Sequence, residues 1–244
     1  MTRRIVQLAG NDALTFLQGV VSNDVRPLAH GPGLVWTALL SAQGKYLADF
    51  FVVNTGAELL LDLPEVVADA TLQRLSMYRL RADVQMLPVD LPVTRGLGTP
   101  PPGALPDPRH PALGWRLYGT AQTDAVDWDA VRVAHLIPET GAELLPGESY
   151  ILECGFERLH GVDFRKGCYV GQEVTARMKH KTDLRKGLIR VKVSAPVPLG
   201  TPIMSDGREV GAVYTQSGGQ AIAYLRLDRS TGPLVAGTAA VVPI

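Results

Sequence analysis

The sequence has little cysteine, no excess of either charge and no long hydrophobic run. Two cysteines in 244 residues are too few for a disulfide framework and favour a reducing compartment. Lys and Arg number 24, as do Asp and Glu, so the bulk charge gives no sign of a nucleic-acid or membrane partner. No apolar run reaches the roughly 18 residues of a transmembrane helix, and the start, MTRRIVQLAGNDAL, lacks the apolar core of a signal peptide. These absences predict a cytoplasmic globular protein that contacts neither membrane nor nucleic acid directly.

Several motifs are absent as well. There is no P-loop, G-x-G-x-x-G, G-x-S-x-G or H-E-x-x-H, so simple NTPase, dehydrogenase and hydrolase functions have no support. No repeat at a fixed period is present, which argues against a solenoid or propeller. A chain of 244 residues with 46% hydrophobic residues can bury a stable core without disulfide bonds or a bound metal ion.

The first ninety residues have the pattern of helices mixed with hairpins. A short strand, 4–8, precedes a helix that Asn11 or Asp12 can cap. Segments 35–40 and 46–53 flank Ala-Gln-Gly-Lys, which predicts a hairpin with Gly44 at a positive φ. We further expect a strand at 58–63, a helix from Glu65 to about Leu80 with Val66, Ala70, Leu72, Leu75 and Met77 on its apolar side, and a strand at 82–87. Helices and antiparallel hairpins together indicate the α+β class.

The residue composition of the rest of the chain changes twice. Residues 98–111 contain six prolines in fourteen positions, which predicts an extended linker or a surface loop. After it we expect a strand at 114–118, a helix at 124–137 and irregular chain at 139–167. Beyond residue 184, five short β-branched segments separated by turn residues predict a small barrel or sandwich. The expected units are an N-terminal α+β domain at 1–97, a proline-rich loop at 98–111, a middle α+β segment at 112–184 and a C-terminal β-barrel at 185–244.

The stretch most suggestive of chemistry is HGVDFRKGCYVGQEVTARMKH, residues 160–180. Its four-residue apolar spacing predicts a helix that starts near Val170 or Gly171, with Glu173 and Arg177 as an i,i+4 pair. Cys168 then lies just before the helix N-terminus, where the helix dipole and nearby basic residues favour thiolate, the nucleophilic and metal-binding form. The alternative is that Cys168 is a small buried side chain, as we expect for Cys154. A metal site of Cys154, His160 and Cys168 has little support because C-x5-H-x7-C is not a paired ligand pattern.

Basic residues dominate 165–186, where seven Lys and Arg accompany only Glu173 and Asp183. A solvated basic face is the simplest interpretation. The functional alternatives are attraction of a polyanionic ligand, or contact with an acidic protein or with RNA. Because no aromatic residues are interleaved, direct RNA recognition is not expected.

KGCYVGQEVTAR closely resembles the K-G-C-[FY]-x-G-Q-E signature of the YgfZ-type folate-binding proteins, which act in iron–sulfur cluster assembly and repair. FLQGVVSND, residues 16–24, is similar to the same family's F-L-Q-G-x-x-T-N-D, with Ser22 in place of threonine. The C-terminal strands with Glu209-Val210-Gly211 also fit, so the likeness covers nearly the whole chain.

The resemblance implies the fold of the glycine cleavage T-protein, an aminomethyltransferase: ferredoxin-like N-terminal and middle α+β domains with a small C-terminal antiparallel β-barrel. It makes 1–97 a folate-binding domain and tetrahydrofolate, with or without a polyglutamate tail, the expected ligand. It also makes Cys168 the functional thiol, supported by Lys166, Gly167, Tyr169, Gly171, Gln172 and Arg177. The folate-binding residues that it suggests are Asn23, Asp24, Asp49, Trp128 and Glu173. Four of these also have a structural alternative: helix termination for Asn23 and Asp24, apolar packing for Trp128, and the surface pair for Glu173.

The function implied is that of an accessory protein for the assembly or repair of iron–sulfur clusters, without conventional turnover. Expected partners are iron–sulfur assembly proteins and [4Fe–4S] client enzymes, such as the radical enzymes that modify tRNA. We expect a monomer that holds no resident metal and carries a cluster transiently if at all. The alternatives are a folate-dependent one-carbon transferase or demethylase, and a folate-sensing scaffold. Ala48 replaces one acid of the paired Asp-Asp found in T-proteins, so that Asp49 alone remains for transferase chemistry.

Overall fold

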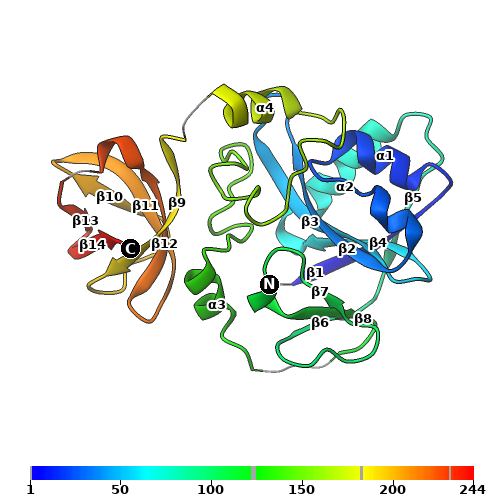
Figure 1. The fold of residues 1–244 in the computed structure, drawn as a ribbon, viewed down its shortest axis with the longest axis horizontal. Helices are drawn as coiled ribbons and strands as arrows, with labels where there is room; N and C mark the ends of the chain where they lie inside the picture. Colours follow the sequence, from blue (N-terminus) through cyan, green and yellow to red (C-terminus); the bar gives the residue numbers. More distant parts are fainter. Residues whose placement is uncertain (1, 122–124, 182–183, 231) are drawn as a thin grey trace.

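The computed structural model describes residues 2–121, 125–181, 184–230 and 232–244. Figure 1 shows a larger body that contains the N-terminal sheet and a smaller barrel beside it, joined through the segment after α4 (Gln172–Lys181). The chain is α+β with a closed C-terminal barrel, so the expected fold class is confirmed. Among the described residues, no helix is both long and apolar enough to cross a membrane.

Five antiparallel strands form the central sheet, in the order β2-β3-β4-β1-β5. They are β1 (Arg3–Ala9), β2 (Gly33–Leu40), β3 (Tyr46–Asn54), β4 (Leu59–Pro64) and β5 (Gln85–Val89). Strand β3 is apolar almost throughout because both of its faces are covered. Phe50 and Val52 face α1 (Ala13–Val20) and α2 (Glu65–Arg79), whereas Phe51 and Val53 face the chain between residues 113 and 188. The sheet is therefore the wall shared by two hydrophobic cores.

Two local predictions in this region need correction. Asp12 precedes α1, but its side chain does not cap the helix and instead accepts a hydrogen bond from the Asp83 backbone N–H at 2.8 Å. Helix α2 lies on the sheet through Val67, Ala68, Thr71 and Leu75, while Val66 and Met77 are 66% and 64% exposed. The apolar side predicted for α2 was therefore mostly wrong, because a polar threonine occupies the buried stripe.

The proline-rich stretch is folded against the first domain. Strands β6 (Val93–Gly96), β7 (Leu105–Pro106) and β8 (Trp115–Tyr118) form a small sheet in the order β6-β8-β7. Residues 98–111 thus supply one of its strands, followed by the short 3-10 helix η2 (Pro111–Leu113). Asp107 and Arg109, within this stretch, are both buried. The loop therefore carries polar side chains into the interior of the larger body.

The middle segment contains fewer regular elements than the sheets. Helix α3 spans Trp128–His135, shorter than the predicted 124–137, and residue 124 lies outside the described ranges. Residues 139–167 are mainly turns, as expected. The helix predicted from Val170 or Gly171 begins at Gln172.

The C-terminal barrel closes in the order β10-β11-β12-β9-β14-β13. Its strands are β9 (Lys186–Val193), β10 (Thr201–Ser205), β11 (Arg208–Ser217), β12 (Gln220–Arg226), β13 (Leu234–Ala236) and β14 (Ala239–Pro243). The short strand β13 was not predicted. Polar contacts join the barrel to the larger body: Thr215 N–H donates to Glu143, and the Tyr224 hydroxyl donates to Glu153 at 2.6 Å. Arg190 also donates to the Ala134 carbonyl at 2.7 Å.

Candidate functional site

Cys168 lies exposed in the loop of residues 166–171 that leads into α4, which we call the Cys168 loop. Its exposure excludes the alternative of a packed, buried thiol. Cys154, by contrast, is buried, and burial raises the pKa of its thiol to about 12. The two cysteines therefore differ in access, and Cys168 is the one that solvent or a partner can reach.

Lys166 ties the loop to helix α1. Its ammonium group is buried and donates to the Gln18 carbonyl, and also to the Val21 carbonyl at 2.8 Å. The Gln18 side chain donates in return to the Lys166 carbonyl at 3.1 Å. A cation beside the carbonyl end of α1 is favoured by the helix dipole, although burial lowers the pKa of Lys166 to about 8. The F-L-Q-G and K-G-C segments, far apart in sequence, thus lie in direct contact.

The other residues of the motif hold the second half of the loop. Tyr169 is buried, and its backbone N–H donates to the Gln172 side chain at 3.0 Å. Gly171 has a φ of +81°, and a Cβ at this position would lie 2.4 Å from the Ser41 carbonyl oxygen of the β2–β3 turn. Glycine is therefore required for α4 to approach this turn. The motif fixes the backbone on both sides of Cys168 and leaves its side chain free.

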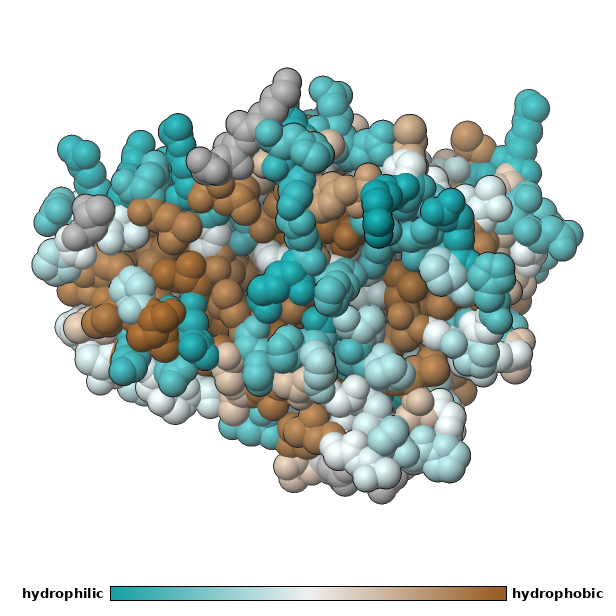
Figure 2. All heavy atoms as spheres, in the orientation of Figure 1, coloured by the Kyte–Doolittle hydropathy of each residue, from teal (hydrophilic) through white to brown (hydrophobic). Residues whose placement is uncertain are grey.

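Helix α4 presents a charged, exposed face. Glu173 and Arg177 are both exposed, and the ion pairs found among the described residues do not include the predicted pair between them. Lys179 instead pairs with Glu157. Figure 2 shows hydrophilic side chains standing along the top of this face of the molecule, where α4 lies. A polar surface with charges of both signs therefore extends along α4.

Asn23 and Asp24 lie at a surface groove of about 640 Å³. The Asn23 amide donates to the carbonyls of Trp36 and His160 at 2.8 and 2.6 Å. Arg26 forms an ion pair with Asp24 and holds the pKa of that carboxyl below its usual value. The groove is also lined by Pro27, Leu34, Val35, Trp36, Pro108, Glu157, His160, Val162, Asp163, Phe164 and Arg165. The side chains of Asn23 and Asp24 already have partners, so they contribute first to the shape of the groove.

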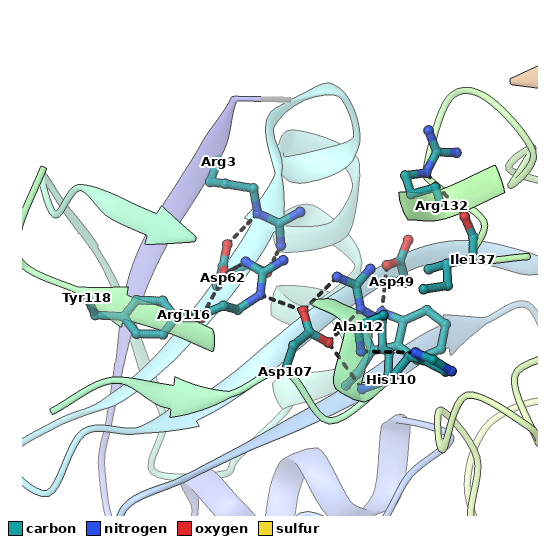
Figure 3. Close-up of polar contacts among 12 residues, drawn as sticks. Arg3, Asp49, Asp62, Asp107, His110, Ala112, Arg116, Tyr118, Arg132 and Ile137 are labelled. Carbon is teal, nitrogen blue, oxygen red and sulfur yellow. Dashed lines mark hydrogen bonds and ion pairs between the residues drawn. The ribbon is translucent and has the colours of Figure 1, made fainter. Parts of the chain in front are cut away.

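Asp49 is buried next to Trp36. Its carboxylate accepts hydrogen bonds from Trp36 Nε1 and the Tyr46 hydroxyl, both at 2.7 Å, and from the Thr140 hydroxyl. It lines a cavity of about 60 Å³. Figure 3 shows Asp49 beside a chain of alternating arginines and aspartates.

This chain, which we call the arginine–aspartate network, was not predicted. Asp62, fully buried, accepts from Arg3, from Arg116 at 3.0 Å and from the Tyr118 hydroxyl at 2.8 Å. Arg116 continues to Asp107 at 3.1 Å, and Arg109 binds Asp107 with two hydrogen bonds. Burial opposes charge on both aspartates, yet the guanidiniums outweigh it and lower the pKa of each. The only sequence signal was Asp-Pro-Arg, residues 107–109, an acid and a base inside a supposed linker.

The predicted site residues thus fall in three places. Cys168 and Glu173 belong to the loop and the first turn of α4; Asn23 and Asp24 lie at the groove; Asp49 lines the cavity. Trp128, in the first turn of α3, packs under the Arg95 guanidinium, which also lines the cavity. Among the described residues, no group of three or more His, Cys, Asp and Glu is arranged to hold a metal ion.

The comparisons with known proteins agree with this architecture. Residues 185–244 match the sequence profile of the CAF17 C-terminal beta-barrel domain. The crystal structure of glycine cleavage system aminomethyltransferase T from Bartonella henselae superposes with a TM-score of 0.77 at 11% identity, covering 99% of this chain and 82% of that one. The fold is therefore that of the T-protein aminomethyltransferases, with a barrel of the CAF17 type.

Proteins related in sequence identify the family within this fold class. The mouse mitochondrial iron–sulfur cluster assembly factor IBA57 is 30% identical, with 95% of this chain and 78% of that protein covered. The human IBA57 is 29% identical at the same coverage. A homologue from Mycosarcoma maydis is 32% identical over 77% of this chain, which spans only 54% of that protein. The chain belongs to the IBA57-type iron–sulfur cluster assembly factors.

These relatives correct one prediction and refine another. The expected cytoplasmic location is wrong, because the relatives are named as mitochondrial proteins. The comparisons assign the chain to the IBA57 type, and the narrower YgfZ-type relationship stays a prediction.

Proposed function

We propose that this chain serves the assembly or repair of iron–sulfur clusters in client enzymes, with Cys168 as its functional thiol. The observation that carries the proposal is the Cys168 loop. Lys166, Tyr169 and Gln172 anchor its backbone, and the thiol between these anchors is exposed. The family of cluster assembly factors to which the chain belongs supports this role for the loop.

A cluster is the cargo in this proposal. Iron–sulfur clusters are held mainly by cysteine thiolates, usually four, and the described residues offer one exposed cysteine and no grouped ligand set. Cys168 therefore supplies one ligand, and a partner protein supplies the others. The thiolate is the form that binds iron. The names of the relatives support a cluster assembly pathway of the mitochondrial type.

Tetrahydrofolate is the proposed ligand, and the groove beside Asn23 and Asp24 offers the better fit for it. Its volume lies within the usual range for small-molecule sites. Leu34 and Phe164 supply apolar wall, and Asp163 supplies a carboxylate that can accept from ring N–H groups. The cavity at Asp49 is about a tenth as large, too small for a pterin ring. The folate roles of Asp49, Trp128 and Glu173 remain predictions.

One-carbon transfer is the alternative function, and it depends on Asp49. Three side-chain donors already satisfy that carboxylate. These donors, all from buried side chains, occupy the carboxylate oxygens and fix the side chain in place. This geometry favours a structural role for Asp49, and we therefore place cluster assembly first.

The test is the activity of a [4Fe–4S] enzyme in cells that lack their native copy of this protein. We expect wild type to restore that activity and Cys168→Ala to fail at equal protein level. Cys154→Ala is the matched control, because it removes the other thiol. If Cys168→Ala restores activity as well as wild type does, the thiol is not the functional group. If wild type itself restores nothing, cluster assembly is not the function in that cell.

A further inference from the structure

The cavity beside Asp49 is lined mainly by guanidinium groups. Arg3, Arg95, Arg109 and Arg116 come from three strands and the proline-rich stretch, and they converge on a space of about 60 Å³. Val93 and Thr140 complete the wall, together with the carboxylates of Asp49 and Glu139. Figure 3 shows two of these arginines, Arg3 and Arg116, meeting at Asp62.

The two carboxylates on the wall already have partners. Asp49 accepts from Trp36, Tyr46 and Thr140. Glu139 lies 3.4 Å from the guanidinium of Arg132, on the side away from the network. Neither carboxylate forms an ion pair with a cavity arginine within the described part of the chain.

The arginines of the cavity, in contrast, outnumber the carboxylates that form ion pairs with them. Arg3, Arg109 and Arg116 share only Asp62 and Asp107. Arg95 has no hydrogen-bond or ion-pair partner among residues 2–121, 125–181, 184–230 and 232–244. Its guanidinium lies 4.3 Å from the centre of the Trp128 ring, and the charge of Glu139 on the cavity wall attracts it. Burial and the charges of Arg116 and Arg109 lower the pKa of Arg95 to about 10, so it stays charged near neutral pH. Glu139 offsets the repulsion from the other arginines only in part, so an added anion would stabilise this partly buried cation.

We propose that this cavity binds a small oxyanion, either inorganic phosphate or the carboxylate group of a larger ligand, with Arg95 as its principal contact. The planar guanidinium of an arginine suits such a group, because it can donate two parallel hydrogen bonds to one anion. The space is sufficient for one such group and too small for an aromatic ring system. This site does not depend on the proposed function, since it uses neither Cys168 nor the groove.

Isothermal titration calorimetry tests the site, with chloride adjusted to keep ionic strength constant. The probes are inorganic phosphate and p-aminobenzoylglutamate, which carries the carboxylates of folate without its pterin. We expect at least one probe to bind wild type, and the probe that binds identifies the source of the anion. For that probe, Arg95→Gln should weaken binding by about tenfold or more, which is the loss expected of a charge-assisted pair of hydrogen bonds. Arg208→Gln, which removes one exposed charge from the barrel, should leave it unchanged.

Thermal unfolding shows whether a variant that loses binding is still folded. Because Arg95 is repelled by its neighbours, Arg95→Gln should unfold at the same temperature as wild type, or higher, in anion-free buffer. The binding probe should raise the unfolding temperature of wild type and of Arg208→Gln but not of Arg95→Gln. Equal affinity and equal thermal shifts in wild type and Arg95→Gln would overturn the proposal, as would the absence of binding by both probes.

Discussion

The Cys168 loop and the arginine–aspartate network are built in opposite ways. The loop is held by contacts to the backbone, from Lys166 to carbonyls of α1 and from the Tyr169 N–H to Gln172, and its reactive side chain is exposed. The network is held by side-chain ion pairs, and its members are mostly buried. A loop anchored through its backbone can change its exposed residue at little cost in stability. A buried network cannot lose one member without leaving another charge unpaired.

The largest effect on stability is expected from Asp62→Asn. It removes the carboxylate that Arg3 and Arg116 share, and Arg116 is almost completely buried. Breaking a buried ion pair from one side costs about 3–5 kcal/mol. Urea unfolding measures this, with Asp69→Asn as the control because Asp69 pairs with Arg4 at the surface. A loss below about 1 kcal/mol in Asp62→Asn, the range of surface pairs, would contradict the role assigned to the network.

The same network predicts an acid-sensitive stability. The pKa values of Asp62 and Asp107 are lowered in the fold, so the unfolded chain binds protons more tightly. Their stabilising contribution is present above the unfolded pKa, about 3.9, and is lost as the pH falls toward the folded values. Unfolding free energies measured from pH 6 down to pH 2 should therefore fall more steeply below about pH 4 in wild type than in Asp62→Asn. Parallel curves would show that Asp62 is not a linked group.

The next effect concerns two glycines of the Cys168 loop. Gly171→Ala adds a Cβ 2.4 Å from the Ser41 carbonyl oxygen at a φ of +81°. Gly167→Ala has a similar φ of +99° but no atom within 4 Å of the new Cβ. Backbone strain alone costs about 1–3 kcal/mol, and only Gly171→Ala adds a steric clash with backbone. Denaturation should therefore show the larger loss in Gly171→Ala, and equal losses would exclude a tight contact between α4 and the β2–β3 turn.

Lys166→Met should cost less stability, about 1–3 kcal/mol, because it leaves two carbonyls at the end of α1 without their buried donor. The loss should depend on pH. Since the pKa of Lys166 is about 8 in the fold and about 10.4 when unfolded, wild-type stability gains a contribution that rises with pH between these values. The difference between wild type and Lys166→Met should widen in that window. Lys192→Met, on the exposed barrel surface, should show a constant difference near zero.

The smallest effect is expected from Glu173→Gln. Glu173 is exposed in the first turn of α4, so its substitution should change the free energy of unfolding by less than about 0.5 kcal/mol. If Glu173 contacts folate as the resemblance implies, fluorescence titration with tetrahydrofolate should nevertheless show weaker binding. Unchanged folate affinity would remove Glu173 from the predicted ligand contacts.

The elements that were predicted correctly are those specified by residues close together in the sequence. The β2–β3 hairpin with Gly44 at φ +72°, the loop before α4 and five of the six barrel strands follow from local patterns of turn residues and apolar spacing. The Lys-Gly-Cys-Tyr and Gly-Gln segments pointed to the Cys168 loop because all of its anchors except Gln18 and Val21 lie within a few residues of one another.

The features that were not predicted are those determined by tertiary packing. The buried stripe of α2 includes Thr71, and the three-residue strand β13 is too short for a periodic pattern. The arginine–aspartate network draws Arg3, Asp62, Asp107 and Arg116 from separate strands and a proline-rich loop, so no spacing in the sequence links them. Buried ion pairs of this kind cannot be predicted from the sequence until the order of the strands is known.

The fold exposes Cys168 and buries Cys154. Alkylation of the native protein with N-ethylmaleimide, followed residue by residue by mass spectrometry, tests it most directly. We predict that Cys168 is labelled at the rate of an accessible thiol, whereas Cys154 is labelled only on unfolding. Protection of Cys168, or equal labelling of both cysteines in the native protein, would contradict the account.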